Sequence, residues 1–172
     1  MPVKGVIWYQ GCANVGRDRQ YEPLFQTLIT DWRKLWKNQD MPFYFVQLAG
    51  FLKPSFCQPD SEWAALRNAQ AKALSLPHTG MATAIDLGNP ADIHPRNKQD
   101  VAHRLALLAL ANDYGHDVTC KAPVLKRIDR KDGRLILTFD GDLKPTSVAL
   151  TGFIISDGKG DFATACGRLI DA

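Results

Sequence analysis

The sequence lacks a hydrophobic run long enough to cross a membrane. Its longest apolar stretch, residues 105–111, is seven residues long, whereas a membrane-spanning helix needs roughly 20. No signal-peptide pattern is present in the 172 residues either. The sequence therefore predicts no membrane partner.

Cysteine is scarce, and the four cysteines are scattered. Cys12, Cys57, Cys120 and Cys166 form no C-x-x-C pair and no Cys/His pair at zinc spacing. We therefore expect no structural metal. The spacing leaves open whether two disulfides form in an oxidising compartment.

An excess of one charge is also missing. The net charge is +3, from 21 basic and 18 acidic residues, which is too small to indicate a nucleic-acid partner. One local basic cluster surrounds a predicted hairpin turn, and a solvated rim is the simpler interpretation of it. A nucleic-acid-binding hairpin is the weaker alternative. The cluster consists of Lys126, Arg127, Arg130, Lys131 and Arg134.

What the sequence does contain is typical of one globular domain with a sizeable core, with 45% hydrophobic and 23% charged residues. Apolar periodicity predicts buried strands over 3–9, 41–50 and 81–89, alternating with helices over 21–37, 63–76 and 98–114. This alternation predicts a parallel sheet covered on both faces. After Ala122 the pattern changes to two hairpins. The predicted fold class is thus α/β over 1–120, followed by a small antiparallel β appendage over 121–172.

Two loops at the carboxyl ends of the predicted strands hold the candidate functional residues. Residues 10–14 (QGCAN) place two uncharged amides around a glycine, which suits an oxyanion hole; a tight turn capped by Asn14 is the alternative. Residues 92–95 (DIHP) place a histidine near a carboxylate, as in the base half of a nucleophilic triad. A polar helix-entry loop is the alternative there. Ligand sites of parallel sheets lie beyond the carboxyl ends of the strands, so we expect the two loops to converge.

Several stretches together are more specific than either loop alone. They are GVIWYQG–AN (5–14), YEPLFQTLITDWR (21–33), PFYFVQLA (42–49), W–LRNAQ (63–70), AIDLGNPADIHPRNK (84–98) and RLALLALANDYG (104–115). In this order they resemble the sialate O-acetylesterases of the SGNH-hydrolase superfamily, and the resemblance covers nearly the whole chain. It implies a partial three-layer, SGNH/flavodoxin-like sheet.

The resemblance also implies roles for five residues. Gln10, Gly11 and Asn14 fall on the superfamily's oxyanion-hole block and would contact the substrate. His94 falls on the catalytic histidine, and Asp92 is the acid that would orient it.

The chain departs from the family pattern at two positions of the first loop, and from the wider superfamily at a third position. Cys12 stands where the family usually has an acid, and Ala13 where it has a small hydroxyl residue. Ala91 occupies the position of the acid in the wider superfamily, which leaves Asp86 as the fallback to Asp92. Cys12 as a substitute nucleophile is a minor alternative, because a cysteine at a strand end is usually a small hydrophobe.

A larger departure is the missing nucleophile. The family's serine lies in a Gly-Asp-Ser block upstream of the VIWYQG stretch, and this sequence contains neither that block nor Gly-x-Ser-x-Gly. We therefore expect the C-terminal portion of a carbohydrate (sialic acid) O-acetylesterase that is inactive alone. The alternative is a non-catalytic carbohydrate-binding or interaction protein with a decayed esterase site.

The resemblance implies an O-acetylated sugar as partner, no metal or organic cofactor, and a periplasmic or secreted location. It also predicts that residues 3–9 form an edge strand, although their composition is that of a central strand. Such an edge invites pairing with a second chain. We expect a dimer or swap through residues 3–9, or an exposed apolar patch beside them. Leu105 and Leu108 should be buried, and Trp32 largely so.

Overall fold

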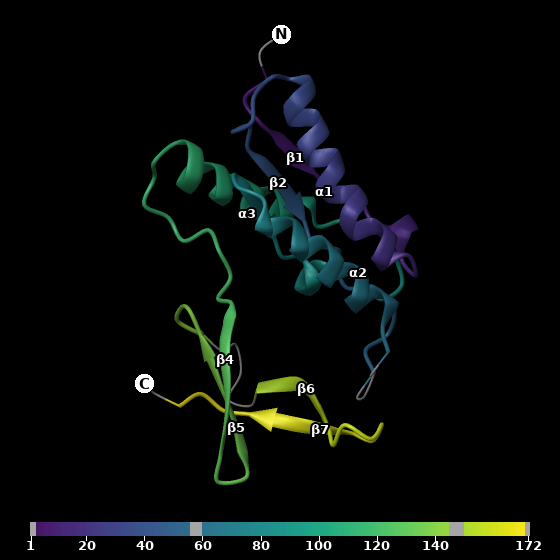
Figure 1. Cartoon of the computed structure of the whole chain (residues 1–172). Coiled ribbons are helices and arrows are strands. Elements are labelled where there is room, and N and C mark those ends of the chain that lie inside the picture. Colours follow the sequence, from purple (N-terminus) through teal and green to yellow (C-terminus); the bar gives the residue numbers. More distant parts are fainter. Residues whose placement is uncertain (1–2, 56–59, 145–149, 171–172) are drawn as a thin grey trace. The chain divides into compact units, whose positions relative to one another are not determined.

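The computed structural model describes residues 3–55, 60–144 and 150–170 (Figure 1). Two compact units are present: Met1–Pro54 with Ser61–Lys121, called the α/β unit below, and Ser55–Asp60 with Ala122–Ala172, called the hairpin unit. The α/β unit contains β1 (Val6–Trp8), η1 (Cys12–Asn14), α1 (Asp18–Leu35), β2 (Phe43–Val46), α2 (Glu62–Ala71), η2 (Lys72–Ser75), β3 (Thr79–Ala82), η3 (Ile85–Leu87) and α3 (Lys98–Asp113). The hairpin unit contains β4 (Leu125–Lys131), β5 (Arg134–Phe139), β6 (Leu150–Ser156) and β7 (Phe162–Gly167).

The sheet of the α/β unit is parallel, with strand order β1-β2-β3. Val6 pairs with Phe43, and Phe45 pairs with Met81. All four residues of β2 are buried, as an apolar run in the centre of a covered parallel sheet requires. The predicted α/β class with a parallel sheet and a small antiparallel segment is confirmed.

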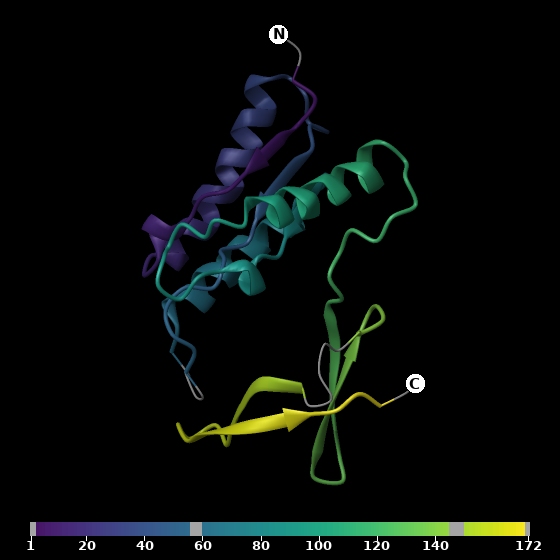
Figure 2. The same ribbon diagram turned by 180° about the vertical axis from the view of Figure 1, so that it is seen from behind.

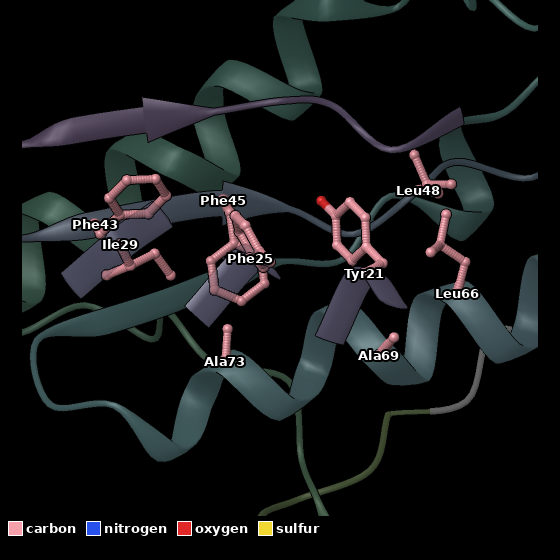
Figure 3. Packing of buried hydrophobic residues seen from close by; sticks show 9 residues of the cluster. All are labelled: Tyr21, Phe25, Ile29, Phe43, Phe45, Leu48, Leu66, Ala69 and Ala73. Atoms are coloured by element: carbon pink, nitrogen blue, oxygen red, sulfur yellow. The ribbon is translucent and has the colours of Figure 1, made fainter. Parts of the chain in front are cut away.

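Helices cover both faces of this sheet, with α1 and α2 on one side and α3 on the other (Figures 1 and 2). Successive strand residues point to opposite faces, so Phe43 and Phe45 pack with α1 and α2. Tyr44 and Val46 pack with α3. Figure 3 shows the first cluster: Leu48, Leu66, Ala69 and Tyr21 lie toward one end, and Phe43 and Ile29 lie toward the other.

Side-chain caps fix where two of the helices begin. Ser61 Oγ accepts the Ala64 N–H at the start of α2 (3.3 Å). Asn97 Oδ1 accepts the Asp100 N–H at the start of α3 (3.2 Å). Each cap satisfies an amide that has no partner within the helix. The second cap ends the segment that contains His94 and starts α3 close to its predicted position.

All three strands of the α/β unit differ from the predicted ranges, and β2 is Phe43–Val46 instead of 41–50. β1 is only Val6–Trp8, and Ile7 is 72% exposed rather than buried. Among the described residues β1 pairs only with β2, so it is an edge strand. The third strand lies at 79–82 instead of 81–89. Its predicted second half forms η3 instead. Just after η3, Gly88 approaches Gly50 so closely that a Cβ on Gly88 would overlap the Gly50 carbonyl, so a glycine is required there.

The expected burial holds for the helix face and only in part for the tryptophan. Leu105 and Leu108 are 8% and 1% exposed and pack on the sheet. Trp32 is half-buried and meets Trp8 edge-on, with ring centroids 5.8 Å apart. It lies over the exposed edge strand, where fewer side chains cover it.

The hairpin unit forms two separate two-stranded sheets, as the turn signals predict. The KDG turn joins β4 and β5, and the DGKG turn joins β6 and β7. No described residue of 122–144 or 150–170 is buried. The basic side chains around the first turn are exposed, consistent with a solvated rim.

Candidate active site

The loop that follows β1, residues 10–14, is held by its own side chains and backbone. Gln10 Nε2 donates to Asn14 Oδ1 (2.7 Å), and the Asn14 N–H donates to the Gly11 carbonyl (2.8 Å). Because the Asn14 oxygen is thereby engaged, its Nδ2 group is the end left to donate to a ligand. The two amides therefore act together, with Gln10 orienting Asn14. We call residues 10–14 the amide loop.

Gly11 is required by the conformation of this loop. Its φ is 147°, a region that L side chains rarely adopt. A Cβ there would also lie 3.1 Å from Gln70 Nε2 and 3.4 Å from Leu48 Cδ2. The backbone of the loop thus touches the buried ends of α2 and β2 directly.

Cys12 is half-buried in the amide loop, and its environment does not activate it. Burial raises the pKa of its thiol, and the positive charge of Lys98 only partly opposes this. A nucleophilic cysteine needs the opposite shift, toward the thiolate. Cys12, Cys120 and Cys166 are free thiols, and Cys57 lies outside the described residues.

The second loop, residues 89–94, is held by a turn around Asp92. The Asp92 N–H donates to the Asn89 carbonyl (3.3 Å), and Asp92 Oδ1 accepts the His94 backbone N–H (2.8 Å). His94 Nδ1 lies 3.9 Å from the same oxygen, and the His94 side chain is 88% exposed. That distance is too long for a hydrogen bond. The predicted pair is adjacent, but the carboxylate binds the His94 backbone and not its ring. We call residues 89–94 the histidine loop.

Asp86, the fallback acid, has another partner. It forms two hydrogen bonds with the Arg104 guanidinium (2.7 and 2.6 Å). The bonds from Arg104 hold the pKa of Asp86 below its usual value. Arg104 also donates to the Thr83 carbonyl (2.6 Å). Asp86 therefore ties α3 to the segment after β3 and does not orient His94.

One contact brings the start of α3 to the end of β1. Lys98 Nζ lies 5.0 Å from the centroid of the Tyr9 ring, a cation–π distance. His94 is only four positions before Lys98, so the two loops lie at the same end of the sheet, where the parallel strands have their carboxyl ends. In the described part of the chain no hydrogen bond joins His94 to the amide loop.

The sequence analysis did not identify one buried residue at the carboxyl ends of these strands. Gln70 of α2 is fully buried and contacts the amide loop. The signal available was a glutamine on the apolar side of a predicted helix. Across residues 3–55, 60–144 and 150–170, no group of His, Cys, Asp and Glu gathers as metal ligands, and no helix is long and apolar enough to span a membrane.

Comparison with known proteins identifies the family. Residues 1–110 match the model of the carbohydrate esterases described as sialic acid-specific acetylesterases. The chain belongs to this family.

Individual relatives agree with that assignment. The chain is 36% identical over 163 residues to the mouse sialate O-acetylesterase, covering 84% of this chain and 30% of that protein. It is 34% identical over 158 residues to the human sialate O-acetylesterase, covering 81% and 30%. A crystal structure of a carbohydrate acetylesterase from Xanthomonas citri matches with a TM-score of 0.86 and 40% identity, over 98% of this chain and 40% of that one.

The chain thus spans about a third of the length of its curated sialate O-acetylesterase relatives. The family match covers the α/β unit up to α3, so it includes both the amide loop and the histidine loop. Each part of the candidate site therefore lies within the acetylesterase segment of the chain.

Proposed function

We propose that this chain supplies the acid–base and oxyanion parts of a carbohydrate O-acetylesterase acting on sialic acid or a related O-acetylated sugar. A serine that these 172 residues do not provide would attack the acetyl carbonyl. His94 would take its proton and return it to the departing sugar hydroxyl. Asp92 would orient His94 and stabilise its positive form.

The observation that carries this proposal is the amide loop. A tetrahedral intermediate is stabilised by hydrogen-bond donors that are fixed in place before the reaction begins, and amides are donors of this kind. Gln10 holds Asn14 by its oxygen (2.7 Å) and leaves its amide nitrogen to donate. Asn14 and the Gly11 backbone N–H are therefore donors of the required kind, at the carboxyl edge where parallel sheets bind ligands.

Asp92 needs a small change to act on His94. The Nδ1 atom of His94 lies 3.9 Å from the Asp92 carboxylate, and the ring is exposed. Catalytic hydrogen bonds are often long without substrate and shorten in the complex. Because the exposed imidazole is free to rotate, we propose that substrate binding brings Nδ1 within hydrogen-bond distance of Asp92.

The proposal is tested in a chimera with the Xanthomonas citri acetylesterase, in which this chain replaces the aligned 40%. We expect turnover of p-nitrophenyl acetate and of O-acetylated sialic acid. His94→Ala should lower kcat on the order of 10⁴-fold, as loss of a triad base does. His103→Ala is the matched control, because His103 is an exposed histidine of α3. Equal loss in both variants would refute the role of His94.

A decayed esterase site that only binds sugar is the second candidate. Cys12 and Ala13 favour it, since they stand where the family resemblance places an acid and a hydroxyl residue. A chimera that binds the sugar without turning it over, and that gains turnover with Cys12→Glu and Ala13→Ser together, would support this candidate. Turnover by the isolated chain, abolished by His94→Ala, would contradict the need for an external serine.

A further inference from the structure

Gln70 is a neutral polar side chain that is fully buried in the α/β unit. Its Oε1 accepts the Leu48 N–H (3.0 Å), and its Nε2 donates to the carbonyls of Gln10 (3.1 Å) and Val46 (3.3 Å). A buried amide is costly unless it is bonded in this way. One side chain of α2 therefore joins the carboxyl ends of two neighbouring strands.

The Gln10 carbonyl receives a second donor from α1, which packs beside α2 on the same face of the sheet. Tyr21 Oη of α1 donates to it (3.3 Å). Burial raises the pKa of the Tyr21 hydroxyl, so it remains a donor at neutral pH. Two helices thus hold one carbonyl oxygen.

Holding this carbonyl fixes the direction of the next amide. No described peptide bond is cis, and in a planar trans peptide the C=O and the following N–H point in opposite directions. The Gln10 carbonyl points into the core toward Gln70 and Tyr21, so the Gly11 N–H points away from it. That N–H has no acceptor in the described part of the chain.

We propose that Gln70 is a positioning residue that sets the direction of the Gly11 N–H. This inference rests on the proposed function, in which that N–H donates to the oxyanion. Gln70 itself is shielded by the amide loop and does not touch the substrate. A Cβ on Gly11 would lie only 3.1 Å from Gln70 Nε2, so Gln70 leaves room for nothing larger than glycine at position 11.

The test is amide NMR on the ¹⁵N-labelled chain. In the wild type we expect the Gly11 N–H to exchange with D₂O on the order of 100-fold faster than the Leu48 N–H, which Gln70 protects. Gln70→Met keeps the length of the side chain and removes its amide. We expect this variant to shift the Gly11 cross-peak and to remove the protection of Leu48.

Gln26→Met is the matched control. Gln26 of α1 also donates an amide proton to a backbone carbonyl, that of Lys72 in η2 (3.4 Å), but this hydrogen bond is exposed to solvent. It should leave the Gly11 and Leu48 signals unchanged. A folded Gln70→Met chain with an unchanged Gly11 cross-peak would overturn the inference, and so would a Gly11 N–H as protected as that of Leu48 in the wild type.

If Gln70→Met does not fold, the inference is tested by a measurement on the wild-type chain. A scalar coupling across the hydrogen bond from Gln70 Nε2 to the Gln10 carbonyl carbon supports the inference, and its absence overturns it. None of these readouts needs turnover. A chimera without esterase activity therefore counts against the proposed function alone. A Gly11 N–H whose NMR signal does not depend on Gln70 counts against the role of Gln70 alone.

Discussion

The two units of this protein are stabilised in different ways. The α/β unit buries a central strand between helices and ties its loops with buried groups such as Gln70 and Arg33. Arg33 is 3% exposed and donates to three backbone carbonyls, those of Met41, Pro77 and His78. The hairpin unit has backbone pairing but no buried side chain among its described residues.

This difference teaches where a functional site can be built. Donors for a transition state must stay in place without reorganising. Among the residues that the structure describes, only those of the α/β unit form a core that can hold such donors. The same residue type should therefore have different energetic consequences in the two units. The following substitutions test that expectation in matched pairs.

The largest effect is expected from a leucine of the core. Leu105→Ala should lower the free energy of unfolding by about 2–5 kcal/mol, because it leaves a cavity between α3 and the sheet. Leu135→Ala in β5, where the side chain is 49% exposed, should cost under about 1 kcal/mol. All four tryptophans, at 8, 32, 36 and 63, lie in the α/β unit, so urea unfolding followed by tryptophan fluorescence measures the first variant. Amide exchange in 125–139 measures the second. Equal costs would show that the hairpin unit has a core of its own.

A smaller difference is expected between two glycines with positive φ. Gly11→Ala should cost about 1–3 kcal/mol, because the conformation is strained and the new Cβ presses on Gln70. Gly133, in the turn between β4 and β5, has φ 71° but open space where a Cβ would lie. Gly133→Ala should therefore cost only the backbone strain, about 1–2 kcal/mol. Thermal unfolding and amide exchange of each unit provide the comparison. An equal response would show that the contact with Gln70 contributes nothing.

The smallest effect concerns pH. The hydrogen bonds from Arg104 lower the pKa of Asp86 in the folded chain, so the pair stabilises the fold above the ordinary pKa of an aspartate. This stability is lost as the pH falls through the lowered folded pKa. The Asp86 side chain is 55% exposed, so the contribution should not exceed about 1 kcal/mol.

Asp86→Asn should therefore be less stable than the wild type at neutral pH, and the gap should close in acid. Urea unfolding at several pH values measures this gap, with Asp31→Asn of the exposed Asp31–Lys34 pair as control. A gap that persists in acid would show that Asp86 acts through something other than its charge.

In the hairpin unit, the bond from the Val124 N–H likewise lowers the pKa of Asp140. A carboxyl NMR titration should therefore place the pKa of both Asp86 and Asp140 below the ordinary value.

The sequence by itself determined the order of the elements and the identity of the family. The short apolar run around Phe43 and Phe45, opened by a proline and closed by a glycine, predicted a buried strand, and the spacing of Leu105 and Leu108 predicted a helix that faces the sheet. The turn glycines predicted both hairpins. These features depend on local pattern, which a single sequence contains in full. The two loops carrying the candidate residues were recognised from the same kind of evidence.

Tertiary structure decided how those loops are held. The third strand ends at Ala82, and beyond η3 the backbones of Gly88 and Gly50 approach each other closely. No local pattern encodes a contact between two glycines 38 positions apart. Asp86 and Arg104 are 18 positions apart and form their ion pair because α3 packs on the sheet. In the sequence, Gln70 looks like an ordinary polar residue of a helix. Its contacts appear only in the fold, where the ends of β1 and β2 lie beside it. Its role arises from burial, because a buried amide must bond to whatever carbonyls and amides the fold brings within reach.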